Sequence, residues 1–389
     1  MTQMRRFGWA IVLLVLAGSG CTRPRGGENT VKIGLIVELT GEMPAVGASS
    51  RNAAELAVSE INKAGVTLGA KDYKLELVIG DNAAKGDQSA ALAHKLITQD
   101  RVLAIVGPNA SIGAVPAAEI AESSKTLLIT PWSTNPKTTL DTRTGAPKKY
   151  VFRACFTDPF EGRVLARFVV DTLHAKSAAV LYDVASEAPK SQAELFRQVF
   201  GELGGTVVAF ETYTTGDRDF SAQLTKIQRA NPDILFLPAY YNDVGLVAQQ
   251  ARRQGLAVPL VGSDAWSSPE LIALSQGAVE GAYFANHYAA DMATPAAQRF
   301  IGAYRQQFGK PPDDVAALTY DAFGLLAKAL HGAGKVDRQA LRDAMAELSN
   351  YSGVTGDIRF APGSGDPVKS AVIMQVKGDT FAWVKNAAP

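Results

Sequence analysis

The stretch VLAIVGPNASIGAVPAAEIAESSKTLLITPWSTNP, residues 102–136, decides the fold of this chain. It contains two short apolar runs, Val102–Val106 and Thr126–Ile129, which are separated by a turn and by a helical pattern over Ile112–Glu122. Apolar runs of strand length that flank a helix predict a βαβ unit of a parallel sheet. We therefore expect an open α/β sheet, in which ligands bind beyond the carboxyl ends of the strands.

Small hydroxyl residues follow both predicted strands. Ser111 comes after the first strand, and Ser133 and Thr134 come after the second. Together with the free N–H groups at the start of a helix, such hydroxyls suit an anionic group such as a carboxylate. The alternative for Ser111 is a purely structural role as the N-cap of the helix. On the first interpretation, this stretch holds one end of a small polar molecule.

The chain has 389 residues, which suits two domains better than one. Strands and helices alternate from Val31 to about Ala154, and the pattern restarts at Asp158 and runs to Gly262. This repetition predicts two α/β lobes with parallel sheets. Three late segments favour an antiparallel addition: Ile358–Phe360, Ser370–Val376 and Phe381–Val384.

Composition and motifs argue against several functions. The net charge of +1 gives no reason to expect a nucleic-acid partner. The two cysteines and four scattered histidines have no metal-ligand spacing, so we expect no metal and no cofactor. The sequence lacks a G-x-G-x-x-G fingerprint after its first strand, a P-loop and a G-x-S-x-G elbow, which argues against an enzyme.

The N-terminal residues 1–21 predict a targeting segment. Arg5 and Arg6 precede the apolar run Phe7–Ala17, which is too short to span a bilayer, and Cys21 follows. This arrangement resembles a bacterial lipoprotein signal, which implies that Cys21 is lipidated. Gly18 stands where such signals usually have Leu, so an ordinary secretory signal is the alternative. Both predict export.

Residues 22–30 are rich in Pro, Gly and polar residues and predict a flexible tether. If Cys21 is lipidated, Cys155 is unpaired, and we expect it to be a small buried apolar residue on a strand.

Six segments, taken in order, carry a family resemblance: VKIGLIVELTG, AELAVSEINKAG, AIVGPNAS, ITPWSTNP, PAYYNDVGLVAQQARRQG and LVGSDAW. They resemble the type I periplasmic binding proteins, and within these the leucine/isoleucine/valine-binding branch that serves branched-chain amino-acid ABC importers. The resemblance covers about residues 31–385. It implies a two-lobed clamshell with the ligand between the lobes. The implied first lobe is 31–157 with 288–356, the second is 158–287 with 357–389, and the hinge strands lie near 153–158, 285–288 and 356–360.

The resemblance also implies a ligand site. Ser111 and Thr134 match residues that hold the amino-acid carboxylate, and Trp132 matches a position that contributes backbone groups. On the second lobe, Tyr240 matches an aromatic contact and Asp264 matches the acid that pairs with the ammonium. With Ser133 from the same turn, these are the expected ligand-binding residues. A zwitterion needs donors for one end and an acceptor for the other, which this set provides.

Three departures from the branched-chain pattern leave the ligand open. Val46 stands where these receptors have a large aromatic residue, and Trp132 where a small residue is common. The second-lobe loop reads Val184–Pro189 where an Asp-x-x-Tyr-Gly pattern is expected, and Glu187 within it is either a cleft residue or simply solvated. Tyr241 and Trp266 are further aromatic candidates, each with a core alternative.

The resulting prediction is an exported, membrane-anchored solute-binding protein that delivers an amino acid to an ABC permease and has no catalytic activity. The alternative is a sensory binding protein for an amide, an organic acid or another small acid on the same fold. The family implies a monomer.

Overall fold

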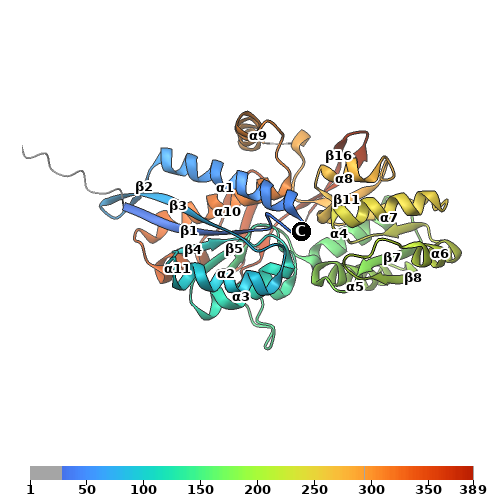
Figure 1. Cartoon of the computed structure of the whole chain (residues 1–389), viewed down its shortest axis with the longest axis horizontal. Coiled ribbons are helices and arrows are strands. Elements are labelled where there is room, and N and C mark those ends of the chain that lie inside the picture. Colours follow the sequence, from blue (N-terminus) through green and yellow to red (C-terminus); the bar gives the residue numbers. More distant parts are fainter. Residues whose placement is uncertain (1–28, 293, 389) are drawn as a thin grey trace, which may run out of the picture.

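The computed structural model describes residues 29–292 and 294–388. The predicted signal segment with its lipidation site at Cys21, and nearly all of the tether, lie outside the described residues. The described residues form two lobes that lie side by side, each built on its own sheet (Figure 1). This is the α/β clamshell architecture that the sequence predicts.

The first lobe contains a six-stranded sheet in the order β2-β3-β1-β4-β5-β6. All neighbouring strands are parallel except β2, which pairs antiparallel with β3. Helices α1 and α10 pack together, and so do α2 and α3. The strands are β1 (Asn29–Val37), β2 (Val66–Leu68), β3 (Lys71–Asp81), β4 (Ala104–Val106), β5 (Leu127–Thr130) and β6 (Val151–Arg153). The helices are α1 (Pro44–Ala64), α2 (Gly86–Thr98), α3 (Ser111–Ser123), α9 (Pro295–Phe308), α10 (Asp314–Ala333) and α11 (Arg338–Ala346).

The second lobe contains a seven-stranded sheet in the order β16-β15-β11-β10-β9-β7-β8. Its last two strands in the chain, β15 and β16, are antiparallel, as the sequence predicts. The strands are β7 (Ser177–Asp183), β8 (Thr206–Tyr213), β9 (Ile234–Phe236), β10 (Leu260–Gly262), β11 (Tyr283–Asn286), β15 (Ala371–Lys377) and β16 (Thr380–Ala387). The helices are α4 (Asp158–Asp171), α5 (Glu187–Glu202), α6 (Ser221–Ala230), α7 (Tyr241–Arg253) and α8 (Glu270–Ser275).

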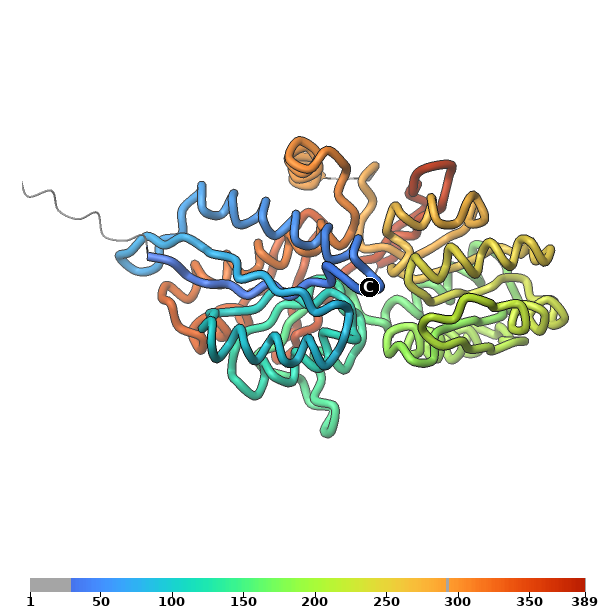
Figure 2. The backbone as a smooth tube through the Cα atoms, viewed as in Figure 1, coloured from blue at the N-terminus to red at the C-terminus, as the bar shows by residue number. Residues whose placement is uncertain are grey.

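Three segments connect the two sheets (Figure 2). They follow β6, β11 and β13, where β13 (Gly356–Phe360) belongs to a small antiparallel sheet with β12 (Tyr351–Gly353) and β14 (Pro367–Val368). The lobe boundaries 31–157 with 288–356 and 158–287 with 357–389 stay a prediction.

Several helices begin earlier than the apolar periodicity predicts. Apolar periodicity predicts helices over Ser49–Lys63 and Val244–Gln254, whereas α1 begins at Pro44 and α7 begins at Tyr241. Pro44 fits the first turn of α1 because proline lacks only an N–H that has no acceptor there. The first turn of α7 is mostly polar, and α1 opens on Pro44 and Gly47, which are turn-forming residues, so neither start carries the apolar periodicity of a helix. The short strand β2 and the helix α8 were also missed.

Two observations bear on metals and membranes. Within the described ranges, no group of three or more His, Cys, Asp or Glu side chains is placed to hold a metal ion. None of the helices described is long and apolar enough to cross a membrane.

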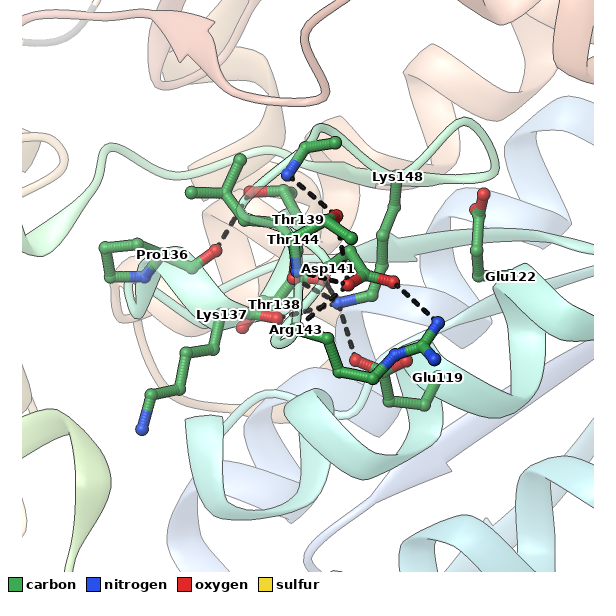
Figure 3. Close-up of polar contacts among 12 residues, drawn as sticks. Glu119, Glu122, Pro136, Lys137, Thr138, Thr139, Asp141, Arg143, Thr144 and Lys148 are labelled. Atoms are coloured by element: carbon green, nitrogen blue, oxygen red, sulfur yellow. Dashed lines mark hydrogen bonds and ion pairs between the residues drawn. The ribbon is translucent and has the colours of Figure 1, made fainter.

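The loop that follows β5 is fixed by one buried lysine (Figure 3). The Nζ of Lys148 donates to the carbonyls of Lys137, Thr138 and Leu140 at 2.8, 3.3 and 2.6 Å. It also lies 3.0 Å from Oε1 of Glu119 in α3. The side chain is only 1% exposed. A single cation therefore replaces the sheet partners that this irregular backbone lacks.

Replacement Lys148→Met should destabilise the protein by about 2 kcal/mol, because three carbonyls and a carboxylate lose their donor while the apolar stem is kept. Thermal or denaturant unfolding measures the effect. The control is Lys149→Met at the exposed neighbouring position, which should leave stability nearly unchanged. Equal stability of the two variants would contradict this account of the loop.

Candidate functional site

The first-lobe half of the site begins where β4 ends. Gly107 has φ +91°, and a Cβ there would lie 2.1 Å from the carbonyl oxygen of Ile36 on the neighbouring strand. Only glycine fits this backbone, which turns the chain into α3. Ser111 is the first residue of that helix, so its N–H belongs to the first turn, where N–H groups have no acceptor inside the helix.

Ser111 does not cap its helix. The N-cap residue is Ala110, and the hydroxyl of Ser111 lies 2.9 Å from the hydroxyl of Ser133. Ser133 in turn lies 2.7 Å from the hydroxyl of Thr138. The structural alternative for Ser111 is therefore wrong. A chain of three hydroxyls links the two turns that leave β4 and β5.

A buried carboxyl fixes the turn from behind. Glu38, directly after β1, accepts from the backbone N–H of Asn109 at 3.0 Å, from its Nδ2 at 2.8 Å, and from the N–H of Ala110 at 3.2 Å. Burial raises the pKa of Glu38, and these donors oppose the shift. Sequence reasoning missed Glu38, although an acidic residue that ends an apolar strand signals a buried partner.

The second turn, Trp132–Asn135, is held by Arg153. Its guanidinium donates to the carbonyl of Ser133 and, at 2.9 Å, to the carbonyl of Asn135. Its Nε lies 2.7 Å from Oδ1 of Asp366. The sulfur of Cys155 also approaches the carbonyl of Ser133, at 3.2 Å. Cys155 is buried as expected, although it lies just after β6 and not within it.

The second-lobe half centres on Asp264, which opens the short 3-10 helix η2 (Asp264–Trp266) after β10. One carboxylate oxygen lies 3.0 Å from Nε2 of His287, and the other lies 3.4 Å from Nε2 of Gln192. Burial lowers the pKa of His287, so the neutral ring donates from Nε2 to Asp264. The carboxylate is thus oriented by a histidine and an amide.

Two further acids surround Asp264. Glu161 accepts from the N–H of Asp264 at 2.7 Å and from Gln192 at 2.8 Å. Burial, and next the charge of Asp264, raise the pKa of Glu161 well above its usual range. Burial raises the pKa of Asp158 to about 7. The hydroxyls of Thr134 and Ser191 lie close to this carboxyl and oppose the rise in its pKa. Among the described residues, neither hydroxyl makes a well-formed hydrogen bond to Asp158.

A small cavity lies between these two halves. It is lined from both lobes by Ala110, Ser111, Trp132, Thr134, Ala188, Pro189, Gln192, Tyr240, Asp264 and Ala265. Five of the six expected ligand-binding residues line it. The sixth, Ser133, does not, because its hydroxyl is engaged between Ser111 and Thr138.

Two aromatic rings face each other across the cavity. The ring centroids of Trp132 and Tyr240 are 6.2 Å apart and tilted by 44°. The indole N–H of Trp132 donates to Oδ2 of Asp314 at 3.0 Å, which directs the ring edge away from solvent. Burial raises the pKa of the Tyr240 hydroxyl.

The other candidate residues lie outside the cavity. Trp266 is fully buried against Gly262 and donates from its indole to the carbonyl of Leu237 at 3.1 Å, so it is a core residue. Val46 and Tyr241 also pack in the core. Glu187 pairs with Lys137 across the two lobes at 2.5 Å, with both side chains about half exposed.

Sequence reasoning also missed Gln192, His287 and Asp314. Gln192 lies within a helix, His287 follows a strand, and Asp314 starts a helix. None of the three lies in the turns after β4, β5, β9 and β10 that supply the expected ligand-binding residues. Only the buried position of a polar residue among apolar neighbours could have signalled them.

The cavity offers opposite chemistry at its two sides. The first lobe presents the hydroxyls of Ser111 and Thr134 and the start of a helix, all suited to an anionic group. The second lobe presents the carboxylate of Asp264, which accepts hydrogen bonds from a cation. The rings of Trp132 and Tyr240 and the small side chains between them supply apolar surface.

Comparison with known proteins gives consistent relatives. The family model described as periplasmic binding protein matches residues 30–380. The leucine-, isoleucine-, valine-, threonine- and alanine-binding protein of Pseudomonas aeruginosa is 30% identical over 332 residues, which cover 85% of this chain and 86% of that protein.

Solved structures show the same similarity. A leucine-binding protein from Thermotoga maritima is 34% identical, with a TM-score of 0.86 over 92% of this chain and 99% of the other. A branched-chain amino-acid transporter substrate-binding protein from Streptococcus pneumoniae, in complex with isoleucine, is 31% identical, with a TM-score of 0.83 over 92% and 100%. The sequence and the two-lobed fold agree with these matches, and the chain belongs to the periplasmic binding protein family.

Proposed function

We propose that this protein is the solute-binding component of an ABC importer and binds an amino acid of branched-chain type, or a related one, in the cavity between its lobes. The observation that carries the proposal is the pairing of hydroxyls and a helix start on one lobe with the carboxylate of Asp264 on the other. These groups match the carboxylate and the ammonium of one small zwitterion.

The proposed orientation assigns each group a role. Ser111 and Thr134 donate to the ligand carboxylate, and Asp264 accepts from the ammonium. His287 and Gln192 hold Asp264 in place. Trp132 and Tyr240 cover the ligand side chain. Closure of the lobes about the three connecting segments brings the two sets of groups together around the ligand, and the permease then recognises the closed form.

A small acid without an ammonium is the second candidate. It is suggested by a relative from Rhodopseudomonas palustris, a solute-binding protein in complex with 3,4-dihydroxybenzoic acid, which is 25% identical with a TM-score of 0.81. Against this candidate, the second-lobe half of the cavity has the carboxylate of Asp264 on its wall, which repels an anion.

The family consists of extracytoplasmic binding proteins of transporters and not of enzymes. We propose that this chain likewise has no catalytic activity of its own, that it is exported and acts as a monomer, and that Cys21 carries a lipid anchor. The charged, apolar and small-residue pattern of residues 1–21 supports the anchor.

A thermal-shift screen of the protein without residues 1–21 tests the ligand class. The panel contains the twenty amino acids, their amides and small organic acids. An amino acid at a hundred times its dissociation constant should stabilise the fold by about 2.7 kcal/mol. A shift with one or more amino acids is the expected result, and a shift only with acids that lack an ammonium would favour the second candidate.

Replacement Asp264→Asn should weaken amino-acid binding by at least roughly 30-fold, or about 2 kcal/mol, because the buried ammonium loses its charged partner. Calorimetric titration measures the loss. The matched control is Asp243→Asn, which removes another buried acid of the second lobe that bonds Tyr213 and does not line the cavity. Unchanged affinity in Asp264→Asn would rule out the ammonium assignment.

Replacement Cys21→Ser should release the full-length protein from the membrane fraction, since an acyl chain contributes roughly 0.8 kcal/mol per buried methylene. Cell fractionation measures the distribution. Cys155→Ser, at the buried cysteine, is the control and should leave the protein membrane-bound. A Cys21→Ser protein that stays with the membrane would exclude the lipid anchor.

A further inference from the structure

One buried carboxyl connects the cavity wall to the contact between the lobes. Asp314, the first residue of α10, accepts from the indole N–H of Trp132 at 3.0 Å through one oxygen. Its other oxygen accepts from the hydroxyl of Ser267. Trp132 and Asp314 belong to the first lobe and Ser267 follows η2 in the second, and all three are almost fully buried.

Ser267 belongs to the same turn as the proposed ammonium ligand. Its backbone N–H donates to the carbonyl of Asp264 at 3.1 Å. This turn therefore presents two groups to the first lobe: Asp264 faces the cavity, and Ser267 reaches Asp314. Because the turn is compact, Asp264 cannot move relative to the first lobe without moving Ser267.

The Ser267 hydroxyl is available to Asp314 only while the lobes touch. Burial, with the charge of Asp313 as the next cause, raises the pKa of Asp314 well above its usual range. A buried carboxyl with both oxygens satisfied is far more favourable than one that has lost a partner. The orientation of the Asp314 carboxyl is thus best defined when the lobes are closed. The same holds for the orientation of the Trp132 indole, which bonds this carboxyl.

We propose that Asp314 is a positioning residue that couples contact between the lobes to the placement of Trp132 in the cavity, and so tunes ligand selectivity. The selectivity part rests on the proposed function, because it takes the cavity as the ligand site. The coupling part depends only on the Trp132–Asp314–Ser267 arrangement.

This coupling gives Trp132 a defined effect on the ligand. The indole occupies space on the cavity wall opposite Tyr240. With its N–H anchored, the ring keeps one orientation and the cavity stays small. Without the anchor the ring can rotate about its side-chain torsions. Larger ligand side chains then lose less binding free energy when they enter the cavity.

Four variants test the arrangement. Asp314→Leu keeps the branched shape of the side chain and removes both acceptors, whereas Asp314→Asn keeps an acceptor for the indole and an amide that can bond Ser267. Ser267→Ala removes only the contact from the second lobe. Ser268→Ala is the matched control, because this neighbouring serine is also buried but its hydroxyl bonds Glu270 within its own lobe.

The first readout needs no ligand. Acrylamide quenching of fluorescence is measured for each variant and for the same variant with Trp132→Phe, and the difference isolates Trp132. Asp314→Leu should give steeper quenching than the parent, Ser267→Ala an intermediate slope, and Asp314→Asn and Ser268→Ala parental slopes. If Asp314→Leu unfolds, the comparison of the quenching slopes of Ser267→Ala and Ser268→Ala still tests the coupling. Equal slopes in these two variants would overturn the coupling.

The second readout is the ratio of dissociation constants for L-leucine and L-alanine, measured by calorimetry. In Asp314→Leu this ratio should shift roughly tenfold in favour of L-leucine, which corresponds to about 1.4 kcal/mol, while Asp314→Asn should restore the parental ratio. An unchanged ratio in Asp314→Leu would overturn the selectivity role. If the parent binds neither amino acid, the proposed function fails, while the quenching result still decides the coupling.

Discussion

The hydrogen bonds of the buried Arg153 guanidinium are the interactions on which the site depends most. It lies at the end of β6, where the chain leaves the first lobe, and it bonds the carbonyls of Ser133 and Asn135 in the cavity turn. A further partner, Asp366, lies beyond β13 on another connecting segment. One cation therefore fixes the shape of the turn that carries Trp132 and Thr134 and ties it to two of the segments about which the lobes move. Arginine suits this task because its planar fork donates in several fixed directions.

The two halves of the cavity are built by different physical means. On the first lobe, neutral hydroxyls and backbone N–H groups line the cavity. The acid behind them, Glu38, accepts hydrogen bonds from Asn109 and Ala110. On the second lobe, carboxyl groups dominate. Burial raises the pKa of both Asp158 and Glu161, which limits the charge gathered around Asp264. A ligand with separate anionic and cationic groups fits this asymmetry, and a simple anion does not.

Contacts between the lobes surround the cavity at different depths. The Lys137–Glu187 ion pair is half exposed and contributes little by itself, since such pairs are typically worth about 0–1 kcal/mol. The Ser267–Asp314 contact is buried and is connected to Trp132. The closed arrangement is thus held mainly by buried polar and aromatic contacts close to the proposed ligand, where a ligand has the greatest influence on closure.

The sequence by itself determined the fold class and half of the cavity lining. Alternating apolar strands and helices define two parallel sheets, and polar residues at the ends of β4, β5, β9 and β10 must gather at one edge of their sheets. Ser111 and Thr134 were predicted from such strand ends, whereas Trp132, Tyr240 and Asp264 were predicted from the family resemblance. Local patterns could not tell Trp132 from Trp266, since both are single tryptophans in short turns after strands.

Only the tertiary structure decided which of these turns meet and what stands behind them. Trp266 folds back over Gly262 of its own strand, whereas Trp132 reaches Asp314 from a helix almost two hundred positions away. Ser133 turns from the cavity to Ser111 and Thr138, and Arg153, His287, Gln192 and Glu161 became visible only through their partners. The physical reason is that a buried polar group is defined by hydrogen bonds across long sequence separations, and periodicity along the chain carries no record of those bonds.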